Sequence, residues 1–229
     1  MKKPIILLIL VLSICQAYGQ NSIVTDIDCG CGKNGQYQTF VDSLSQLPTK
    51  FQFIVNSWFE QSMTDFTGNI KFVKGVNYDL ENWLGNDSIT QSRIRDAVPK
   101  YQLVYQLSDP ELKIKAFCIK IELDSYGQVT DFGWPRENYN KREKFVKPTA
   151  ALELALKQCK IKKLKTDKYY FMLRFDPELK RLYWHISFVQ KTTGDKWSGS
   201  EDYIEMHIDA TELKIIEEKD GGIDWMTRE

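Results

Sequence analysis

The stretch KYQLVYQLSDPELKIKAFCIKIEL, Lys100–Leu123, decides the fold that this sequence predicts. Apolar and polar residues alternate on both sides of a central Asp-Pro-Glu, and alternation with a period of two is typical of strands with one buried face. Asp and Pro favour a tight turn. The stretch therefore predicts two antiparallel strands, Tyr101–Leu107 and Ile114–Leu123, joined by a turn at Asp109–Glu111.

The pentapeptide DPELK at this turn occurs twice, at Asp109–Lys113 and at Asp176–Lys180. The second copy also separates two aromatic-rich runs, Tyr169–Phe175 and Leu182–Gln190, and a helical pattern lies upstream of each copy. Five identical residues in matching surroundings favour an internal duplication. Asp-Pro is also common turn chemistry that recurs without shared ancestry, so both origins stay open.

Helical and strand-like patterns account for the rest of the chain. Apolar residues at helical spacing predict helices over 40–47, 51–66, 88–97 and 149–160. Alternation predicts further strands over 70–76, 128–132 and 203–210, with an extended segment over 213–217. The predicted fold class is α+β, with helices packed on antiparallel sheet.

These patterns divide the sequence into six segments. They are a signal peptide (1–19), a flexible Cys- and Gly-rich leader (20–36), N-terminal helices with a first sheet unit (37–132), a connecting segment (133–148), a second helix-and-sheet unit (149–218) and a C-terminal tail (219–229).

The first twenty residues, MKKPIILLILVLSICQAYGQ, have the three parts of a secretory signal. Two lysines precede the apolar stretch Ile5–Cys15, and Ala17 and Gly19 supply small residues for cleavage. An apolar helix of this length spans about 16 Å, roughly half of a ~30 Å bilayer core, so a permanent membrane span is not expected. A lipoprotein anchor at Cys15 is disfavoured because the branched Ile14 precedes it. We expect a periplasmic or secreted protein that begins near Gln20.

The composition indicates a globular protein with a real core. The chain is 42% hydrophobic and 13% aromatic, and its 31 basic and 31 acidic residues give a formal net charge of zero. A surface without excess positive charge gives no reason to expect binding to nucleic acid or to anionic membranes.

The four cysteines outside the signal peptide are candidates for disulfides: Cys29, Cys31, Cys118 and Cys159. An even number in an oxidising compartment favours pairing, and four cysteines allow three arrangements. A disulfide between Cys118, within a predicted strand, and Cys159, late on a predicted helix, is compatible with the pattern. The segment DCGCGKNG also suggests a soft-metal or redox loop. No histidine lies near it, so a flexible leader that carries disulfide partners is favoured.

The sequence contains two histidines, His185 and His207, in adjacent predicted strands. Alternation places both on the face opposite the buried residues, with Ser187 on the first strand. The weak candidates for a metal site, or for an acid/base pair, are His185, His207, Glu205 and Asp209. The alternative is a polar sheet face exposed to solvent, and a one-residue slip in register would separate the group.

Motifs for enzyme chemistry are absent from the sequence. There is no GxSxG, HExxH, P-loop or GxGxxG after a strand. The KTTG at 191–194 only resembles a KTG box, and no SxxK accompanies it. We therefore predict no catalytic residues, no cofactor and no enzyme activity. The predicted interaction surface combines the outer sheet face with two loop tryptophans: Tyr183, His185, Tyr203, His207, Trp134 and Trp197.

Residues 147–218 resemble a PepSY-like domain. The matching motifs are the helix TAALELALKQ, the hairpin YYFMLRFDPELKRLYWHISFVQ and the closing YIEMHIDATELKIIEE. Glu212-Leu213 replaces the turn glycine usual in the family. The region 88–132, with ELDSYGQVTDF in the closing role, is similar to a more divergent second copy, and the helices predicted within 37–66 lie outside the resemblance.

The resemblance implies a helix packed on a small antiparallel sheet in an exported bacterial protein. It also implies an inhibitory or regulatory role toward peptidases, with no catalytic residues. The expected function is an exported, non-enzymatic protein-binding or regulatory module whose partner is a peptidase or an envelope component. The alternative is a small-ligand or metal-binding module that uses His185 and His207.

Overall fold

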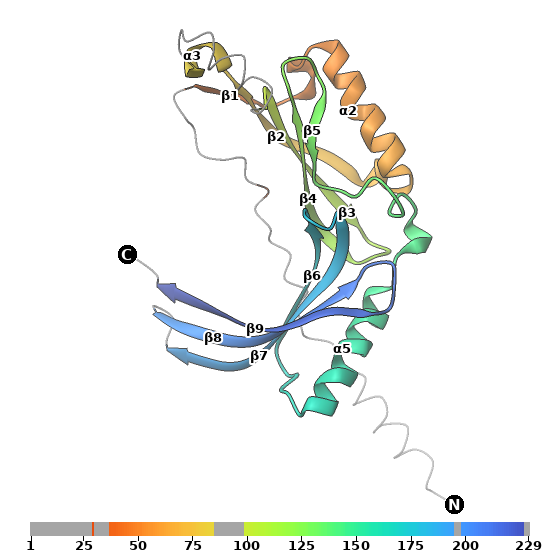
Figure 1. Ribbon diagram of the computed structural model, residues 1–229, viewed down its shortest axis with the longest axis vertical. Coiled ribbons are helices and arrows are strands. Elements are labelled where there is room, and N and C mark those ends of the chain that lie inside the picture. The colour runs from red at the N-terminus through yellow and green to blue at the C-terminus, as the bar shows by residue number, and fades with distance from the viewer. Residues whose placement is uncertain (1–28, 30–36, 85–98, 195–197, 227–229) are drawn as a thin grey trace, which may run out of the picture.

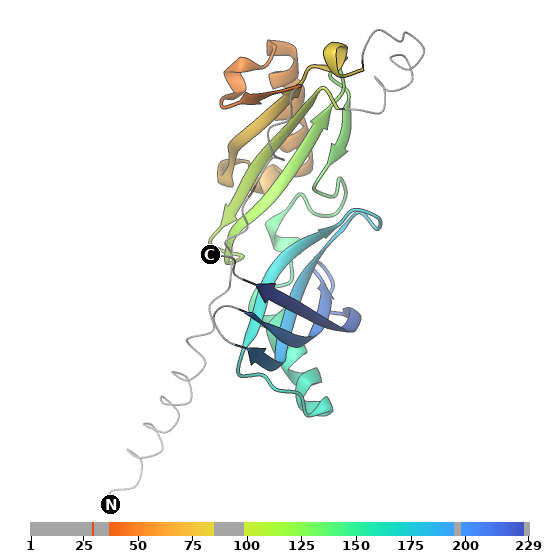
Figure 2. The same ribbon diagram turned by 90° about the vertical axis from the view of Figure 1, so that its left-hand side faces the viewer.

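A computed structural model describes Cys29 and residues 37–84, 99–194 and 198–226. The described chain forms two antiparallel sheets with a few helices, which confirms the predicted α+β class (Figure 1). The first sheet and helix α2 form one end of an elongated molecule, and the second sheet and α5 form the other (Figure 2). None of the helices within the described ranges has the length and apolarity that a membrane crossing requires.

The first sheet has the strand order β1-β2-β3-β4-β5, so neighbours in sequence are neighbours in the sheet. Its strands are β1 (Gln38–Val41), β2 (Ile70–Tyr78), β3 (Tyr101–Asp109), β4 (Ile114–Leu123) and β5 (Val129–Phe132). Short helical segments lie between them: η1 (Leu44–Gln46), α2 (Thr49–Ser62), η2 (Thr64–Asn69) and α3 (Leu80–Leu84).

The second sheet has the order β6-β7-β8-β9 and follows the connecting segment. Its strands are β6 (Tyr169–Asp176), β7 (Arg181–Gly194), β8 (Ser198–Asp209) and β9 (Ile215–Met226). The 3-10 segment η3 (Arg142–Lys144) and helix α5 (Pro148–Lys162) precede it.

Helix α2 covers one face of the first sheet through an aromatic stripe. Phe51, Val55 and Phe59 recur every four residues on this face, and Val55 is completely buried. The ring of Phe51 meets Tyr101 edge-on at 5.4 Å between centroids, and that of Phe59 lies 4.5 Å from Tyr105. This packing fixes which face of β3 looks inward.

Helix α5 packs on the second sheet through small residues. Ala151, Ala155 and Cys159 recur every four residues and are fully buried, which lets the helix lie close to the sheet. Pro148 occupies the first helical turn, where its missing N–H costs nothing, and Lys147 is the N-cap residue. The helix predicted over 149–160 therefore begins one residue earlier than expected, at Pro148.

The connecting segment supplies aromatic residues where the two sheets meet. Trp134 contacts Phe66 and Phe117 edge-on at 5.5 and 5.6 Å, and Phe145 lies 5.6 Å from Phe66. One hydrophobic core runs continuously from α2 through these rings to the second sheet. Trp134, predicted as a loop contact, is only 1% exposed, so that prediction is wrong and the residue is part of the core.

Both DPELK copies form the same turn. Each joins two antiparallel strands, and the terminal lysine is left-handed in each, with φ of 54° at Lys113 and 49° at Lys180. The aspartate Oδ1 accepts a main-chain N–H three residues on in both copies, from Leu112 in the first and Leu179 in the second. Each sheet therefore contains one hairpin with this turn.

The helix predicted over Phe40–Leu47 is wrong. Residues Gln38–Val41 form an edge strand that pairs with β2, and only Leu44–Gln46 form a 3-10 turn, capped by Ser43. Val41 pairs with Gly75, where an added Cβ would lie 2.6 Å from Leu103 Cδ2. Sheet pairing across this glycine overrides the local helical spacing.

The C-terminal region contains more strand than the sequence predicted. Strands β7 and β8 extend through most of the predicted 191–202 loop, with Thr193 opposite Ser200. Strand β9 continues through residues predicted as a tail: Gly221 pairs with Tyr203, whose ring lies over it and would be 2.4 Å from an added Cβ. Here glycine makes room for an aromatic cross-strand neighbour and does not end the strand.

The disulfide joins Cys29 to Cys118, with 5.4 Å between Cα atoms and a sequence separation of 89. Cys159 is a free, buried thiol, and burial raises its pKa to about 11. The pairing of Cys118 with Cys159 is therefore wrong, because the side chain of Cys118 lies on the opposite face of its sheet from the core. Cys31, the predicted helix over 88–97, the signal peptide and the rest of the leader lie outside the described residues.

Candidate functional site

A row of polar side chains crosses the outer face of the second sheet, opposite α5. The strand register places His185 on β7 directly opposite His207 on β8, and His207 opposite Glu217 on β9. This is the face that alternation predicted for the two histidines. The register settles what the sequence could not, since the two imidazoles are direct cross-strand neighbours.

Hydrogen bonds link this row into a chain. His207 Nδ1 lies 2.6 Å from Glu217 Oε2, His185 Nδ1 lies 2.9 Å from His207 Nε2, and Ser187 Oγ lies 2.8 Å from His185 Nε2. Since a carboxylate only accepts, the Nδ1–H of a neutral His207 donates to Glu217 and its Nε2 accepts from His185 Nδ1–H. His185 Nε2 then accepts from the Ser187 hydroxyl, and every polar atom is satisfied.

A second polar row lies alongside the first. Ser187 is opposite Glu205, and Glu205 is opposite Lys219. Glu205 Oε2 lies 3.5 Å from His207 Nε2, and the Lys219 ammonium lies 3.6 Å from Glu205 and 3.3 Å from Glu217. The ligand atoms of His185, Glu205 and His207 all lie within 4.8 Å of one another.

The two imidazoles are buried although they lie on the outer face. His185 is 5% exposed and His207 is 7% exposed, so both the alternative of a solvent-exposed face and the predicted interaction surface are wrong at these two positions. Burial lowers the pKa of His185 to about 3, with further contributions from Arg174, His207 and Lys219. Burial also lowers the pKa of His207, while Glu217 and Glu205 oppose that shift. Both imidazoles are therefore neutral at pH 7.

Tyr183 and a shallow depression border the histidine row. The Tyr183 ring lies 4.4 Å from that of His207 between centroids. The depression, of about 280 Å³, is lined by Tyr183, His207 and Glu217 together with the second DPELK turn. It gives solvent a route to the edge of the row.

Among the other predicted site residues, Asp209 does not join the cluster. Its Oδ1 accepts main-chain N–H groups of Thr211 and Glu212 and so caps the turn before β9. Tyr203 packs over Gly221 and is half-buried. Trp197 lies outside the described residues. The structure thus brings together three of the four candidate metal ligands.

Sequence reasoning missed Glu217 and Lys219 as members of the site. Both belong to β9, whose inner part was read as a short extended segment followed by a tail. Glu217 and Lys219 are two residues apart with Glu218 between them, so a strand through all three places both side chains on one face. Extending the predicted 213–217 segment to Lys219, as a strand paired with β8, would have placed both residues opposite His207 and Glu205.

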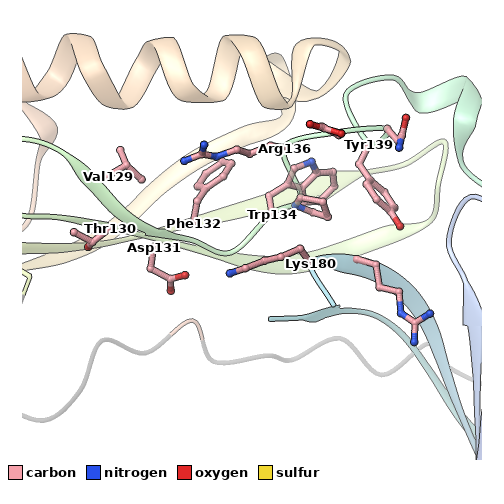
Figure 3. Close-up of a pocket in the computed structure, with 12 residues that line it drawn as sticks. Val129, Thr130, Asp131, Phe132, Trp134, Arg136, Tyr139 and Lys180 are labelled. Carbon is pink, nitrogen blue, oxygen red and sulfur yellow. The ribbon is translucent and has the colours of Figure 1, made fainter. Parts of the chain in front are cut away.

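A separate cleft of about 650 Å³ lies where the two sheets meet (Figure 3). All four residues of β5 line it, as do Trp134, Arg136, Tyr139 and Lys180. Because side chains of both strand faces border the same cleft, it runs along the edge of β5 that does not pair with β4. Within the described parts of the chain, β5 is the last strand of its sheet.

Three cations line this cleft: Arg136, Lys180 and Arg181, of which Arg181 lies 3.9 Å from Asp176. Figure 3 shows Arg136 on one side of Phe132 and Trp134, and Lys180 on the other. The Arg136 guanidinium stacks 4.0 Å above the Trp58 ring, and Lys180 lies 5.9 Å from the Phe175 ring. Among the residues that the structure describes, neither Arg136 nor Lys180 has a carboxylate partner, whereas Asp131 pairs with Lys120 at 3.2 Å.

Comparison with known proteins identifies no relatives: no family model, no curated protein and no solved structure matches this chain. The resemblance to PepSY-like domains stays a prediction. Function has to be argued from the chain's own geometry.

Proposed function

We propose that this protein is an exported, non-enzymatic recognition module that holds an extended, acidic segment of a partner protein against strand β5. The observation that carries the proposal is the cleft along the outer edge of β5, flanked by Arg136 and Lys180. Among the residues that the structure describes, this edge pairs with no strand and neither cation pairs with a carboxylate. The partner class expected from the sequence, a peptidase or an envelope component, is part of the same proposal.

Main-chain groups of β5 would supply the first part of recognition. The Gly133 N–H donates to Lys120 O at 2.8 Å, so this residue faces β4. Hydrogen-bonding direction alternates along an antiparallel strand, and Phe132 therefore directs its main-chain groups to the cleft. The register shift at Thr130 interrupts this alternation further along β5. An extended segment can add at this edge as a further strand, which is a recurrent mode of peptide recognition.

Charge would supply the second part. Arg136 and Lys180 stand on either side of the added segment and favour carboxylate side chains within it. The aromatic floor of Phe132, Trp134 and Tyr139 offers apolar contact. Because β5 has only four residues, few main-chain hydrogen bonds form, and the complex is expected to be weak and transient.

The disulfide supports action outside the cytoplasm. A bond such as Cys29–Cys118 persists in oxidising compartments and is rare where thiols are kept reduced. This agrees with the secretory signal expected at the N-terminus.

Selection from a random peptide display library, using the chain from Gln20 as bait, tests the proposal. We expect enriched peptides to be acidic and to slow hydrogen exchange at the Phe132 main-chain N–H, which faces the cleft. The Gly133 N–H is the internal control, because it already donates to Lys120 O and should exchange at the same rate with and without peptide.

A charge reversal tests the second half of the recognition site. Lys180→Glu should weaken binding of the selected peptides at least fivefold, while Lys113→Glu in the other DPELK turn should leave it unchanged. If no acidic peptides are enriched, or if bound peptides leave exchange at Phe132 unchanged and Lys180→Glu binds them like the unmodified chain, the proposed function is wrong.

A further inference from the structure

We propose that Nδ1 of His185, Nε2 of His207 and a carboxylate oxygen of Glu205 form a binding site for a divalent transition-metal ion of the Zn²⁺ class. The site lies on the outer face of the second sheet, away from the β5 cleft. The proposed metal site uses different residues from the cleft, so its test is independent of the test of the recognition function proposed above.

The three ligand atoms already lie at near-coordination spacing. A tetrahedral ion with bonds of about 2.0–2.1 Å needs neighbouring ligand atoms roughly 3.3 Å apart. The two imidazole nitrogens are 2.9 Å apart and Glu205 Oε2 is 3.5 Å from His207 Nε2. Small rotations of two side chains would complete the geometry, because all three come from adjacent strands of one rigid sheet.

In each imidazole, the ring nitrogen that would not bind the metal is hydrogen-bonded to an oxygen, as metal-binding histidines require. A ligating histidine normally gives its other ring N–H to a carboxylate or another oxygen, which fixes its tautomer and orientation. Glu217 holds His207 Nδ1 at 2.6 Å, and Ser187 Oγ holds His185 Nε2 at 2.8 Å. This supporting shell distinguishes the group from a chance cluster of polar residues.

Binding would replace the proton that lies between the two imidazoles with the metal ion. In the metal-free chain that proton is on His185 Nδ1 and points at His207 Nε2. On binding it moves to His185 Nε2 and is donated to Ser187 Oγ, which frees the Nδ1 lone pair. The exchange is a change of tautomer at His185, so it releases no proton from either imidazole.

The ligand set indicates which ions the site would take. Two imidazoles and one carboxylate suit Zn²⁺, Cu²⁺, Ni²⁺ or Co²⁺, whereas Mg²⁺ and Ca²⁺ prefer oxygen ligands alone. Three protein ligands leave a fourth position for water. The depression beside His207 and Tyr183 provides the route for the ion and that water.

The positive charge of the Lys219 ammonium is the main electrostatic obstacle to a cation at this site. It lies 3.6 Å from Glu205 and 3.3 Å from Glu217, and its charge balances these carboxylates in the metal-free chain. Its side chain is 47% exposed and can swing into solvent. Lys219→Gln should therefore tighten metal binding several-fold, an effect opposite to that of removing a ligand.

The experiment is a titration of the chain from Gln20, freed of metal by a chelator, with Zn²⁺ and separately with Co²⁺. Histidine ¹⁵N NMR should show His185 changing from the Nδ1–H to the Nε2–H tautomer with Zn²⁺, while His207 keeps its Nδ1–H. Co²⁺ should give d–d bands of a tetrahedral nitrogen and oxygen site. A thiolate charge-transfer band should be absent, which excludes Cys159 and Cys31 as ligands.

Conservative variants keep the test valid if a histidine replacement fails to fold. Glu205→Gln should weaken Zn²⁺ binding, and Glu217→Gln, which alters only the support of His207, should weaken it about 10–100-fold. Glu212→Gln on the neighbouring turn is the matched control and should change nothing. Circular dichroism of each variant confirms the fold.

Two outcomes would overturn the inference. One is Zn²⁺ binding that leaves both histidine tautomers unchanged. The other is affinity that does not respond to Glu205→Gln or to Lys219→Gln, which would place any bound ion elsewhere on the chain.

Discussion

The two DPELK turns have the same sequence and the same backbone but opposite surroundings. Asp109 is completely buried, and its Oδ2 accepts from Asn69 Nδ2 and Arg142 Nε, each at 2.9 Å. Asp176 is partly exposed, and its nearest cation, Arg181, is 3.9 Å away. The pentapeptide therefore determines a local conformation, while the packing around it determines how much each residue contributes to stability.

The leucines of the two turns differ in the same way. Leu112 is 4% exposed and belongs to the core, whereas Leu179 is 60% exposed. The first turn is a junction in the middle of the molecule, and the second borders the cleft and the depression. The same DPELK motif is therefore part of the core in the first sheet and lies on the surface in the second.

The largest contrast is expected for aspartate. Asp109→Ala should destabilise the fold by about 3–5 kcal/mol, because it leaves the Arg142 cation and two N–H donors without their buried acceptor. Asp176→Ala should cost only about 0.5–1 kcal/mol, the value of a turn hydrogen bond. Urea unfolding of both variants measures the difference, and equal losses would contradict it.

Leucine should give the next largest contrast. Leu112→Ala should cost about 3 kcal/mol through lost burial and the cavity left behind, while Leu179→Ala should stay within about 0.5 kcal/mol of the unmodified chain. Thermal unfolding of the two leucine variants measures the difference. A large loss with Leu179→Ala would mean that this side chain is covered in solution.

The outer faces of the two sheets should differ in their response to pH. Burial depresses the pKa of His185 to about 3, and its charged neighbours are Arg174, Lys219, Glu205 and Glu217. Below about pH 6.5 the unfolded chain takes up a proton that folded His185 does not, so stability falls as pH decreases. A single such group lowers the metal-free chain's stability by about 2 kcal/mol between about pH 7 and pH 5.

His185→Gln should flatten this pH dependence, because the side chain no longer titrates. Asp131→Asn on the first sheet is the control and should leave the dependence in place. Denaturant midpoints at several pH values in the presence of chelator would decide, and a profile unchanged by His185→Gln would contradict the expectation.

The smallest effect should be the same in both turns. Lys113 and Lys180 have left-handed backbone conformations that are strained for a residue with a Cβ. Replacement of either by Gly should stabilise the chain by about 0.5–1 kcal/mol, whereas replacement by Ala should not. If only one glycine variant is stabilised, the two turns are less alike than their dihedral angles indicate.

Sequence patterns predicted the helices and strands correctly where local forces dominate. The alternation around DPELK predicted β3, β4, β6 and β7, and helical spacing predicted α2 and α5, because burial of one face enforces these periods. They failed at Phe40–Leu47, where pairing with β2 overrides a weak helical pattern. They also failed at Gly221, where the sequence suggested an end to the strand and the sheet uses the glycine to admit the Tyr203 ring.

For the candidate site, the sequence by itself determined that His185, His207 and Glu205 share one face, since successive side chains of a strand alternate between faces. Only the tertiary structure decided that they converge, that Glu217 and Lys219 join them and that Asp209 does not. It likewise decided that Cys29, and not Cys159, pairs with Cys118. Register, burial and disulfide pairing depend on contacts between residues far apart in the chain, and those contacts are set by the packing of whole sheets, which no local pattern encodes.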